Sequence, residues 1–150
     1  MSLQFLKAGT ADAVSLVAIS KHAFDSDVDV GGTGAGGPPG SNSLPYHTKM
    51  ARLGCLYKLM EDYKTVGGAI LFKKDDGMNI GRIFVAPEYF RKGYGIFMIQ
   101  QIEAQFSEIK IFTLDTPIWN MRTNAFYQKL GYTEVRRDSD FVYYEKRRGS

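Results

Sequence analysis

Two positive charges and two glycines stand together in the middle of this chain, directly after an apolar segment. Arg91 and Lys92 precede Gly93 and Gly95, with Tyr94 between the glycines. Glycine allows a close approach to the backbone. A helix that begins here directs unpaired N–H groups, and the positive end of its dipole, at the same spot. These features favour a site for a phosphate-bearing group. The spacing fits neither a P-loop nor a dinucleotide-binding fingerprint, whose third glycine is missing.

A strand and a helix must flank this turn to position it. Residues 79–86 are mostly apolar and predict a strand that leads into the turn. Residues 94–107 predict an amphipathic helix, because their large apolar side chains recur on one side. The phosphate site is therefore expected where this strand ends and this helix begins.

The other expected elements follow from apolar periodicity and turn residues. Strands are predicted at 3–7, 55–61, 65–73, 110–115, 132–136 and 141–145, and helices from Thr10 or Asp12 onward, at 47–53 and at 120–130. Lys74 to Gly77 predicts a hairpin turn, and Gly131 stands where a helix commonly ends. This order predicts an α/β (α+β) fold, a mixed sheet with helices on both faces.

Residues 25–45 differ in composition from the rest of the chain. They are acidic at first and then dominated by glycine and proline, so no packed helix or strand is expected. The segment is too long for an ordinary connection, which predicts a flexible loop that is either disordered or a functional lid. A phosphate cradle is disfavoured here, because no strand leads into the segment and no cation flanks it.

Size, charge and cysteine content bound the class of protein. The 150 residues, 44% hydrophobic, predict one domain over 1–150. No stretch reaches the roughly 18 to 20 apolar residues of a membrane span, and Cys55 alone forms no disulfide framework or cysteine-based zinc cluster. A cytoplasmic protein is expected. The net charge is +3, and the basic residues at 136–137 and 146–148 are interpreted as a solvated tail rather than a nucleic-acid surface.

The segment at 90–95 resembles the acyl-CoA pyrophosphate loop of the GNAT N-acetyltransferase superfamily, written (Gln or Arg)-x-x-Gly-x-(Gly or Ala). Gly93 and Gly95 match the two small positions. Phe90 stands where the family has Gln or Arg, and Arg91, one place later, is the candidate to take over that contact.

A second segment, later in the chain, resembles the same family. Asn120, Tyr127 and the run Leu130-Gly131-Tyr132 follow the pattern of the family's last helix. The resemblance implies a mixed, mostly antiparallel central sheet with helices on both faces. It also implies transfer of an acetyl group from acetyl-CoA to a primary amine of a small molecule or protein, without a metal.

The resemblance assigns roles to particular residues. The backbone of Ile83, Phe84 and Val85 would pair with the pantetheine arm of CoA and polarise the thioester. The residues expected to hold the rest of the CoA are Arg91, Lys92, Gly93, Tyr94, Gly95 and Asn120. Tyr127 would give a proton to the leaving thiolate, since a phenol is protonated at neutral pH.

The base that deprotonates the amine stays open. Asn79 stands where some members of the family have a catalytic glutamate. The alternatives are Glu88, His47, Asp27, Asp29 or a chain of water molecules. A different function also stays open, that of a GNAT-fold module that binds acyl-CoA as a sensor without catalysis. The acceptor is not identified, and a second copy of the chain is left open as a partner.

Overall fold

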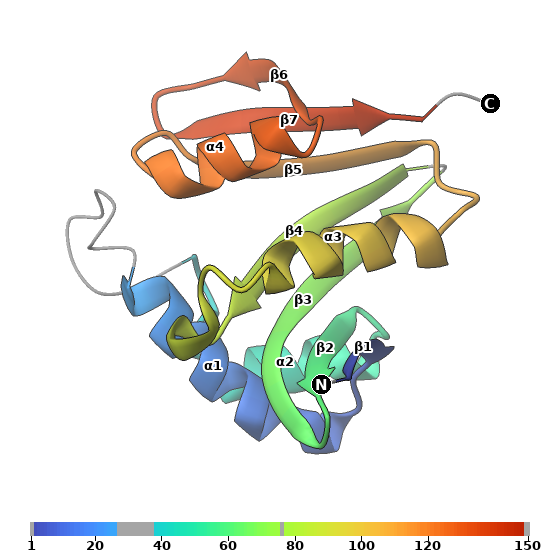
Figure 1. The fold of residues 1–150 in the computed structure, drawn as a ribbon, viewed down its shortest axis with the longest axis vertical. Helices are drawn as coiled ribbons and strands as arrows, with labels where there is room; N and C mark the ends of the chain where they lie inside the picture. Colours follow the sequence, from blue (N-terminus) through green and yellow to red (C-terminus); the bar gives the residue numbers. More distant parts are fainter. Residues whose placement is uncertain (1, 27–37, 76, 149–150) are drawn as a thin grey trace.

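A seven-stranded sheet is the frame of the protein in the computed structural model, which describes residues 2–26, 38–75 and 77–148 (Figure 1). The strands are β1 (Leu3–Lys7), β2 (Leu56–Glu61), β3 (Lys64–Lys74), β4 (Gly77–Val85), β5 (Ile111–Pro117), β6 (Thr133–Arg137) and β7 (Phe141–Arg147). Their order in the sheet is β1-β2-β3-β4-β5-β7-β6. Every neighbouring pair is antiparallel except β4 and β5, which are parallel. The expected mixed, mostly antiparallel sheet is confirmed.

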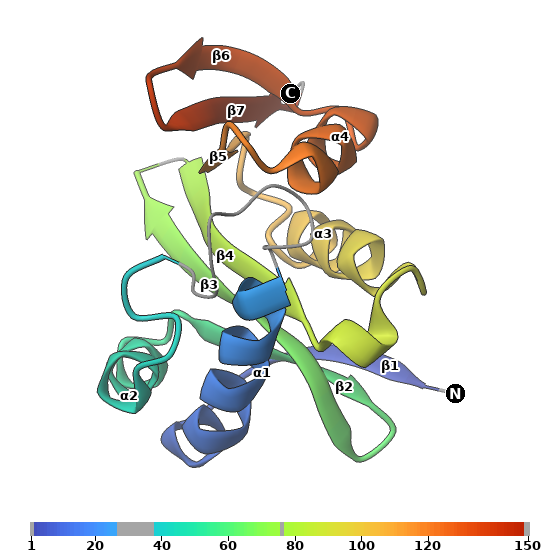
Figure 2. The same cartoon turned by 90° about the vertical axis from the view of Figure 1, so that its left-hand side faces the viewer.

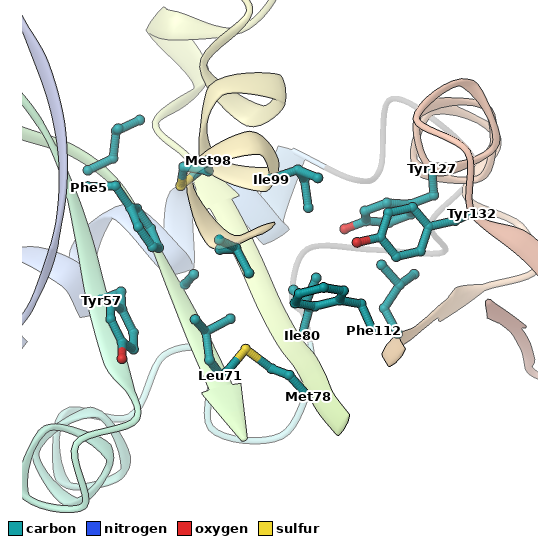
Figure 3. Close-up of a cluster of buried hydrophobic side chains, with 14 of the residues drawn as sticks. Phe5, Tyr57, Leu71, Met78, Ile80, Met98, Ile99, Phe112, Tyr127 and Tyr132 are labelled. Atoms are coloured by element: carbon teal, nitrogen blue, oxygen red, sulfur yellow. The ribbon is translucent and has the colours of Figure 1, made fainter. Parts of the chain in front are cut away.

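Helices cover both faces of the sheet (Figure 2). They are α1 (Ala13–Asp25), α2 (Leu44–Arg52), α3 (Tyr94–Gln105) and α4 (Met121–Lys129), with short 3-10 helices η1 (Thr10–Asp12) and η3 (Pro87–Tyr89). One core cluster joins α3 and α4 to the sheet, and Figure 3 shows Met98 of α3 on the side of Phe5 and Ile99 on the side of Phe112. A second cluster, around Leu16 and Phe84, joins α1 and α2 to the opposite face. The alternation of strand side chains thus supplies both layers.

The two central strands separate after a short stretch of pairing. Residues 77–79 of β4 pair with 111–113 of β5, but β4 continues to Val85 and β5 to Pro117. Across β3 and β4 the register shifts, so that Gly81 is an extra residue in β4. A Cβ at Gly81 would lie 2.6 Å from the Phe72 ring. Such a bulge bends its strand and increases its twist. The sheet therefore opens between β4 and β5.

The structure differs from the predicted elements before α2. This helix begins at Leu44 rather than at residue 47, because the Ser43 hydroxyl accepts a hydrogen bond from the Tyr46 N–H and Pro45 stands in the first turn. Of the segment predicted as a flexible loop, residues 27–37 lie outside the described residues. The following residues form hydrogen-bonded turns that lead into α2.

The interpretation as a solvated tail is wrong for Lys146 and Arg148, although Arg147 between them is exposed. The Arg148 guanidinium donates to the carbonyl oxygens of Glu103 (2.6 Å), Phe106 (2.6 Å) and Ile109 (3.0 Å), at the C-terminal end of α3. Lys146 donates to the Leu130 carbonyl, at the end of α4. The last carbonyls of a helix lack intrahelical partners, and cations near them are favourable. These two side chains fasten both helices to the sheet.

We expect Arg148→Leu to lower the free energy of unfolding by about 2 to 3 kcal/mol, because three carbonyl groups lose their donor. Arg147→Leu is the matched control, since Arg147 is exposed and its ion-pair partner among the described residues is its near neighbour Glu145. The control should change stability by less than about 0.5 kcal/mol. Urea denaturation of the two variants measures the difference. Equal effects would show that Arg148 does not fasten α3.

Candidate functional site

A cleft of about 850 Å³ lies where β4 and β5 separate. One wall is β4 from Ile80 to Val85, and the other includes the end of β5 and the first turns of α4. The loop before α3 and the start of that helix border the cleft, and residues from the end of α1 with Pro38 and Pro39 also line it. The cleft therefore touches both helical layers.

The loop that leads into α3 has two left-handed residues. Gly93 is the residue before α3, with φ +80°, and Arg91 has φ +66°. No side chain caps the helix, so its first N–H groups face outward from the turn. A Cβ at Gly93 would meet nothing within 4 Å, whereas one at Gly95 would lie 3.1 Å from the Phe126 ring. Gly93 thus satisfies the backbone conformation and leaves open space, while Gly95 permits the contact between α3 and α4.

The structure brings most of the predicted CoA-binding residues to this cleft. Ile83, Phe84 and Val85 line it, and so does Arg91. Lys92 is not among the lining residues, and its ammonium group lies 5.5 Å from the centre of the Tyr89 ring.

Two other predicted residues have clear structural partners. The Tyr94 side chain is buried and its hydroxyl donates to Glu61, so what it offers the cleft is mainly its backbone. The Asn120 side chain, 2% exposed, accepts a hydrogen bond from the Thr123 N–H at 3.1 Å. Asn120 is therefore the cap of α4, and it also lines the cleft.

Tyr127 reaches the cleft from α4. Its side chain is 7% exposed and its ring lies against those of Tyr132 and Tyr144. Figure 3 shows the hydroxyl pointing away from α4. In the described part of the chain, no residue forms a hydrogen bond with that hydroxyl. Burial raises the pKa of the phenol, and the charge of Asp115 raises it further. Tyr127 is thus protonated at neutral pH, in contact with the cleft.

The residues considered as bases lie elsewhere. The Asn79 amide donates to Thr113 Oγ1 at 3.1 Å and joins β4 to β5 at their last paired residues. Glu88 is exposed on η3, and neither it nor Asn79 lines the cleft. Asp27 and Asp29 are outside the described residues.

His47 is buried beneath the Arg82 side of the cleft rather than in it. It is 0% exposed, and its Nδ1 lies 2.9 Å from the Ser43 carbonyl oxygen. Burial lowers the pKa of the imidazole, and the positive charge of Arg82 lowers it further. His47 is not among the lining residues, so the structure gives it a packing role against Phe84.

Sequence reasoning missed three charged residues that line the cleft, which are Arg122 on α4 and two strand residues, Arg82 on β4 and Asp115 on β5. Arg82 stacks on the Tyr46 ring at 4.8 Å and donates to the Pro39 carbonyl. The Asp115 side chain is exposed at the cleft. Its partial burial raises the pKa of the carboxyl, and the charge of Asp138 raises it further. The sequence signal that could have identified the two strand residues is a charged side chain within an otherwise apolar strand.

Neither a membrane helix nor a metal cluster is found in the part of the chain that the structure describes. None of the helices in the described ranges is both long enough and apolar enough to cross a bilayer. Within residues 2–26, 38–75 and 77–148, no three His, Cys, Asp or Glu side chains are grouped so that they could hold a metal ion.

Residues 53–134 match the family model of the acetyltransferase (GNAT) domain. Because this match covers more than half of the sequence, the chain belongs to the GNAT acetyltransferase family. A relative from Bacillus subtilis (strain 168), the uncharacterized protein YrkN, is 30% identical over 80 residues, which are 51% of this chain and 43% of that protein. The match thus spans less than half of the length of this relative.

Solved structures share the whole fold. The PaiA N-acetyltransferase from Thermoplasma acidophilum, in complex with coenzyme A, superimposes with a TM-score of 0.86 at 16% identity, over 99% of this chain and 100% of that one. The ribosomal-protein-S18-alanine N-acetyltransferase from Escherichia coli gives a TM-score of 0.73 at 17% identity, over 97% of this chain and 94% of that one. At such identities the likeness shows the fold, and the expected GNAT architecture is confirmed.

The buried His47 makes stability depend on pH. Its pKa is lower in the folded than in the unfolded protein, so the unfolded chain binds the proton more tightly. Its stabilising contribution is complete above the ordinary histidine pKa of about 6.5 and is lost as the pH falls below it, by up to about 1.4 kcal/mol per pH unit. His47→Gln should flatten this slope in urea denaturation between pH 7.5 and 5. His22→Gln leaves His47 in place and should keep the slope due to it.

Proposed function

We propose that this protein transfers the acetyl group of acetyl-CoA to a primary amine of a small molecule or a protein. The observation that carries the proposal is the opening of the sheet between β4 and β5, with the start of α3 and the Tyr127 phenol at one cleft. Membership of the GNAT acetyltransferase family supports it. The single cysteine is in keeping with a reducing compartment such as the cytoplasm.

The cleft suits a long ligand with a phosphate-bearing end. The uncapped N–H groups of α3 and the Arg91 guanidinium place positive charge at one end, where a pyrophosphate would be stabilised. Beyond residue 79 the edge of β4 that faces β5 pairs with no strand of the described residues. Its N–H and C=O groups can pair with an amide-containing arm, as in the addition of a strand to a sheet.

The proposed chemistry needs few protein groups. Acetyl-CoA supplies an activated thioester. The free backbone of Ile83–Val85 orients it and donates to its carbonyl oxygen, which gains negative charge as the bond to the amine forms. Tyr127 holds a proton beside this edge and gives it to the sulfur as the C–S bond breaks. Burial favours the neutral phenol, so the proton is present at neutral pH.

A catalytically silent module that only binds acyl-CoA would share the donor end of this cleft. The two functions differ in one measurable product, the free thiol of CoA released when an amine is added. We expect thiol release from acetyl-CoA with a panel of primary amines. Binding of CoA without release for any amine would favour the silent module.

Arg91→Gly should change stability and binding in opposite directions. Arg91 has a positive φ, which costs a non-glycine residue roughly 1 to 2 kcal/mol, partly offset by the greater flexibility of glycine in the unfolded chain. The variant should therefore gain about 0.5 to 1 kcal/mol of stability. It should bind CoA about two- to fivefold more weakly by calorimetry, because an exposed phosphate contact is lost.

Lys92→Ala is the control for this variant, since Lys92 carries the same charge in the same loop but is not among the residues that line the cleft. It should weaken CoA binding less than Arg91→Gly does. Tighter binding by Arg91→Gly would remove Arg91 from the proposed donor site.

Tyr127→Phe should reduce turnover at least about tenfold, because general acid assistance typically contributes 10²–10⁴-fold. The fold and CoA affinity should be kept, since the hydroxyl has no hydrogen bond within the described residues. Tyr132→Phe is the matched control. The Tyr132 hydroxyl donates to Glu103 at 3.1 Å and lies outside the cleft lining, so this variant should lose about 1 kcal/mol of stability but keep turnover. Steady-state kinetics and denaturation together separate the two roles.

A further inference from the structure

Asp115 stands at the end of β5, on the wall of the cleft that faces β4. Its neighbours Leu114 and Thr116 are buried, whereas Asp115 is exposed. Since strand side chains alternate, Asp115 points to the opposite side from these two neighbours. In the register with β7 it lies opposite Tyr143. A carboxylate is therefore held on a rigid strand where the sheet opens.

The charges around the cleft make this carboxylate distinctive. Arg82, Arg91 and Arg122 also line the cleft, and each adds a positive charge. Among the described lining residues, Asp115 is the only carboxylate. The guanidinium groups repel an ammonium group that enters the cleft. Of these charges, only that of Asp115 attracts it.

The carboxylate is also available. No donor in residues 2–26, 38–75 or 77–148 forms a hydrogen bond or ion pair with the Asp115 side chain. Other acidic side chains nearby are engaged, as Asp138 accepts from Tyr143 at 2.8 Å and Glu134 from Arg137 at 2.7 Å. A carboxylate left without a protein partner beside a cavity is suited to bind a ligand.

We propose that Asp115 is the residue that binds the ammonium group of the acceptor and receives its proton. The inference rests on the proposed function. The ammonium passes one proton to the Asp115 carboxylate, and the free amine forms the N–C bond with the acetyl carbon as the C–S bond breaks. The sulfur takes a proton from Tyr127, which recovers one from the new amide nitrogen. The proton on Asp115 leaves to water, so each turnover yields amide, CoA thiol and one proton.

The surroundings of Asp115 support this role. Partial burial raises the pKa of the Asp115 carboxyl. The negative charge of Asp138, on the turn between β6 and β7, raises it further. Arg136 lies beside Asp138 at 4.0 Å and reduces that effect. The facing hydroxyl groups of Tyr127 and Tyr143 are neutral at pH 7. A carboxylate with a raised pKa is a stronger base, closer to the range in which a general base works.

The first test measures binding and needs no turnover. The affinity of the CoA-loaded protein is measured by calorimetry for phenethylamine and for its neutral analogue phenethyl alcohol. Wild type should bind the amine at least about fivefold more tightly than the alcohol, and Asp115→Asn should abolish that preference. Asp140→Asn, which removes an equal charge from a neighbouring turn outside the cleft lining, should retain it. A preference that survives Asp115→Asn, or no preference in wild type, would overturn the inference.

The second test separates this inference from the proposed function. If wild type releases thiol with the amine, Asp115→Asn should raise KM for the amine and lower kcat at least about tenfold. It should also remove the rise of kcat/KM with pH on the acidic limb, while CoA affinity and thermal stability stay the same. Unchanged kinetics in Asp115→Asn would reject the inference and leave the proposed function standing. An inactive wild type that still shows the charge preference would reject the proposed reaction and leave the role of Asp115 in amine binding.

Discussion

The separation of β4 from β5 is the constraint on which the rest of this structure depends. The two strands pair over three residues and then part, so that backbone N–H and C=O groups in the middle of the sheet have no strand partner within the described part of the chain. The extra residue at Gly81 bends β4, and a side chain there would collide with Phe72. Once the sheet is open, α3 can direct its N-terminus, and α4 its Tyr127, to the same gap. A fully paired sheet of the same strands would have no cleft.

Local patterns in the sequence predicted the parts of the fold that local interactions determine. The turn at Gly93 and the helix after it follow from backbone conformation and apolar periodicity, and both are found. The sequence pattern predicts a start for α2 that is three residues too late, because the cap at Ser43 lies in a segment whose composition suggests a loop. Arg148 was misinterpreted because its three carbonyl partners are distant in sequence. Asp115 was overlooked because only the three-dimensional fold shows that its strand borders an opening.

The cleft has two electrostatically different ends. Arg91 and the start of α3 make one end positive, which suits the phosphates of the proposed donor. Asp115 provides negative charge on the opposite wall, and the phenol of Tyr127 stays neutral near it. A donor and an acceptor of opposite charge would thus be guided to different parts of one cavity. Electrostatic complementarity of this kind contributes more to orientation and to rates of encounter than to affinity.

Arg148, whose guanidinium donates to carbonyl oxygens at the end of α3, is synthesised well after that helix. Arg148 follows Glu103 by 45 residues, so the ribosome adds it about 2 to 9 seconds later, at roughly 5 to 20 residues per second. During this interval the end of α3 lacks the Arg148 donor for its last carbonyls, and β7, which Arg148 directly follows, has not joined the sheet. A nascent chain therefore lacks a firm binding cleft until β7 is made. Competence to bind the proposed donor would come late in translation, and a transcript truncated before this codon would yield a protein with a frayed α3.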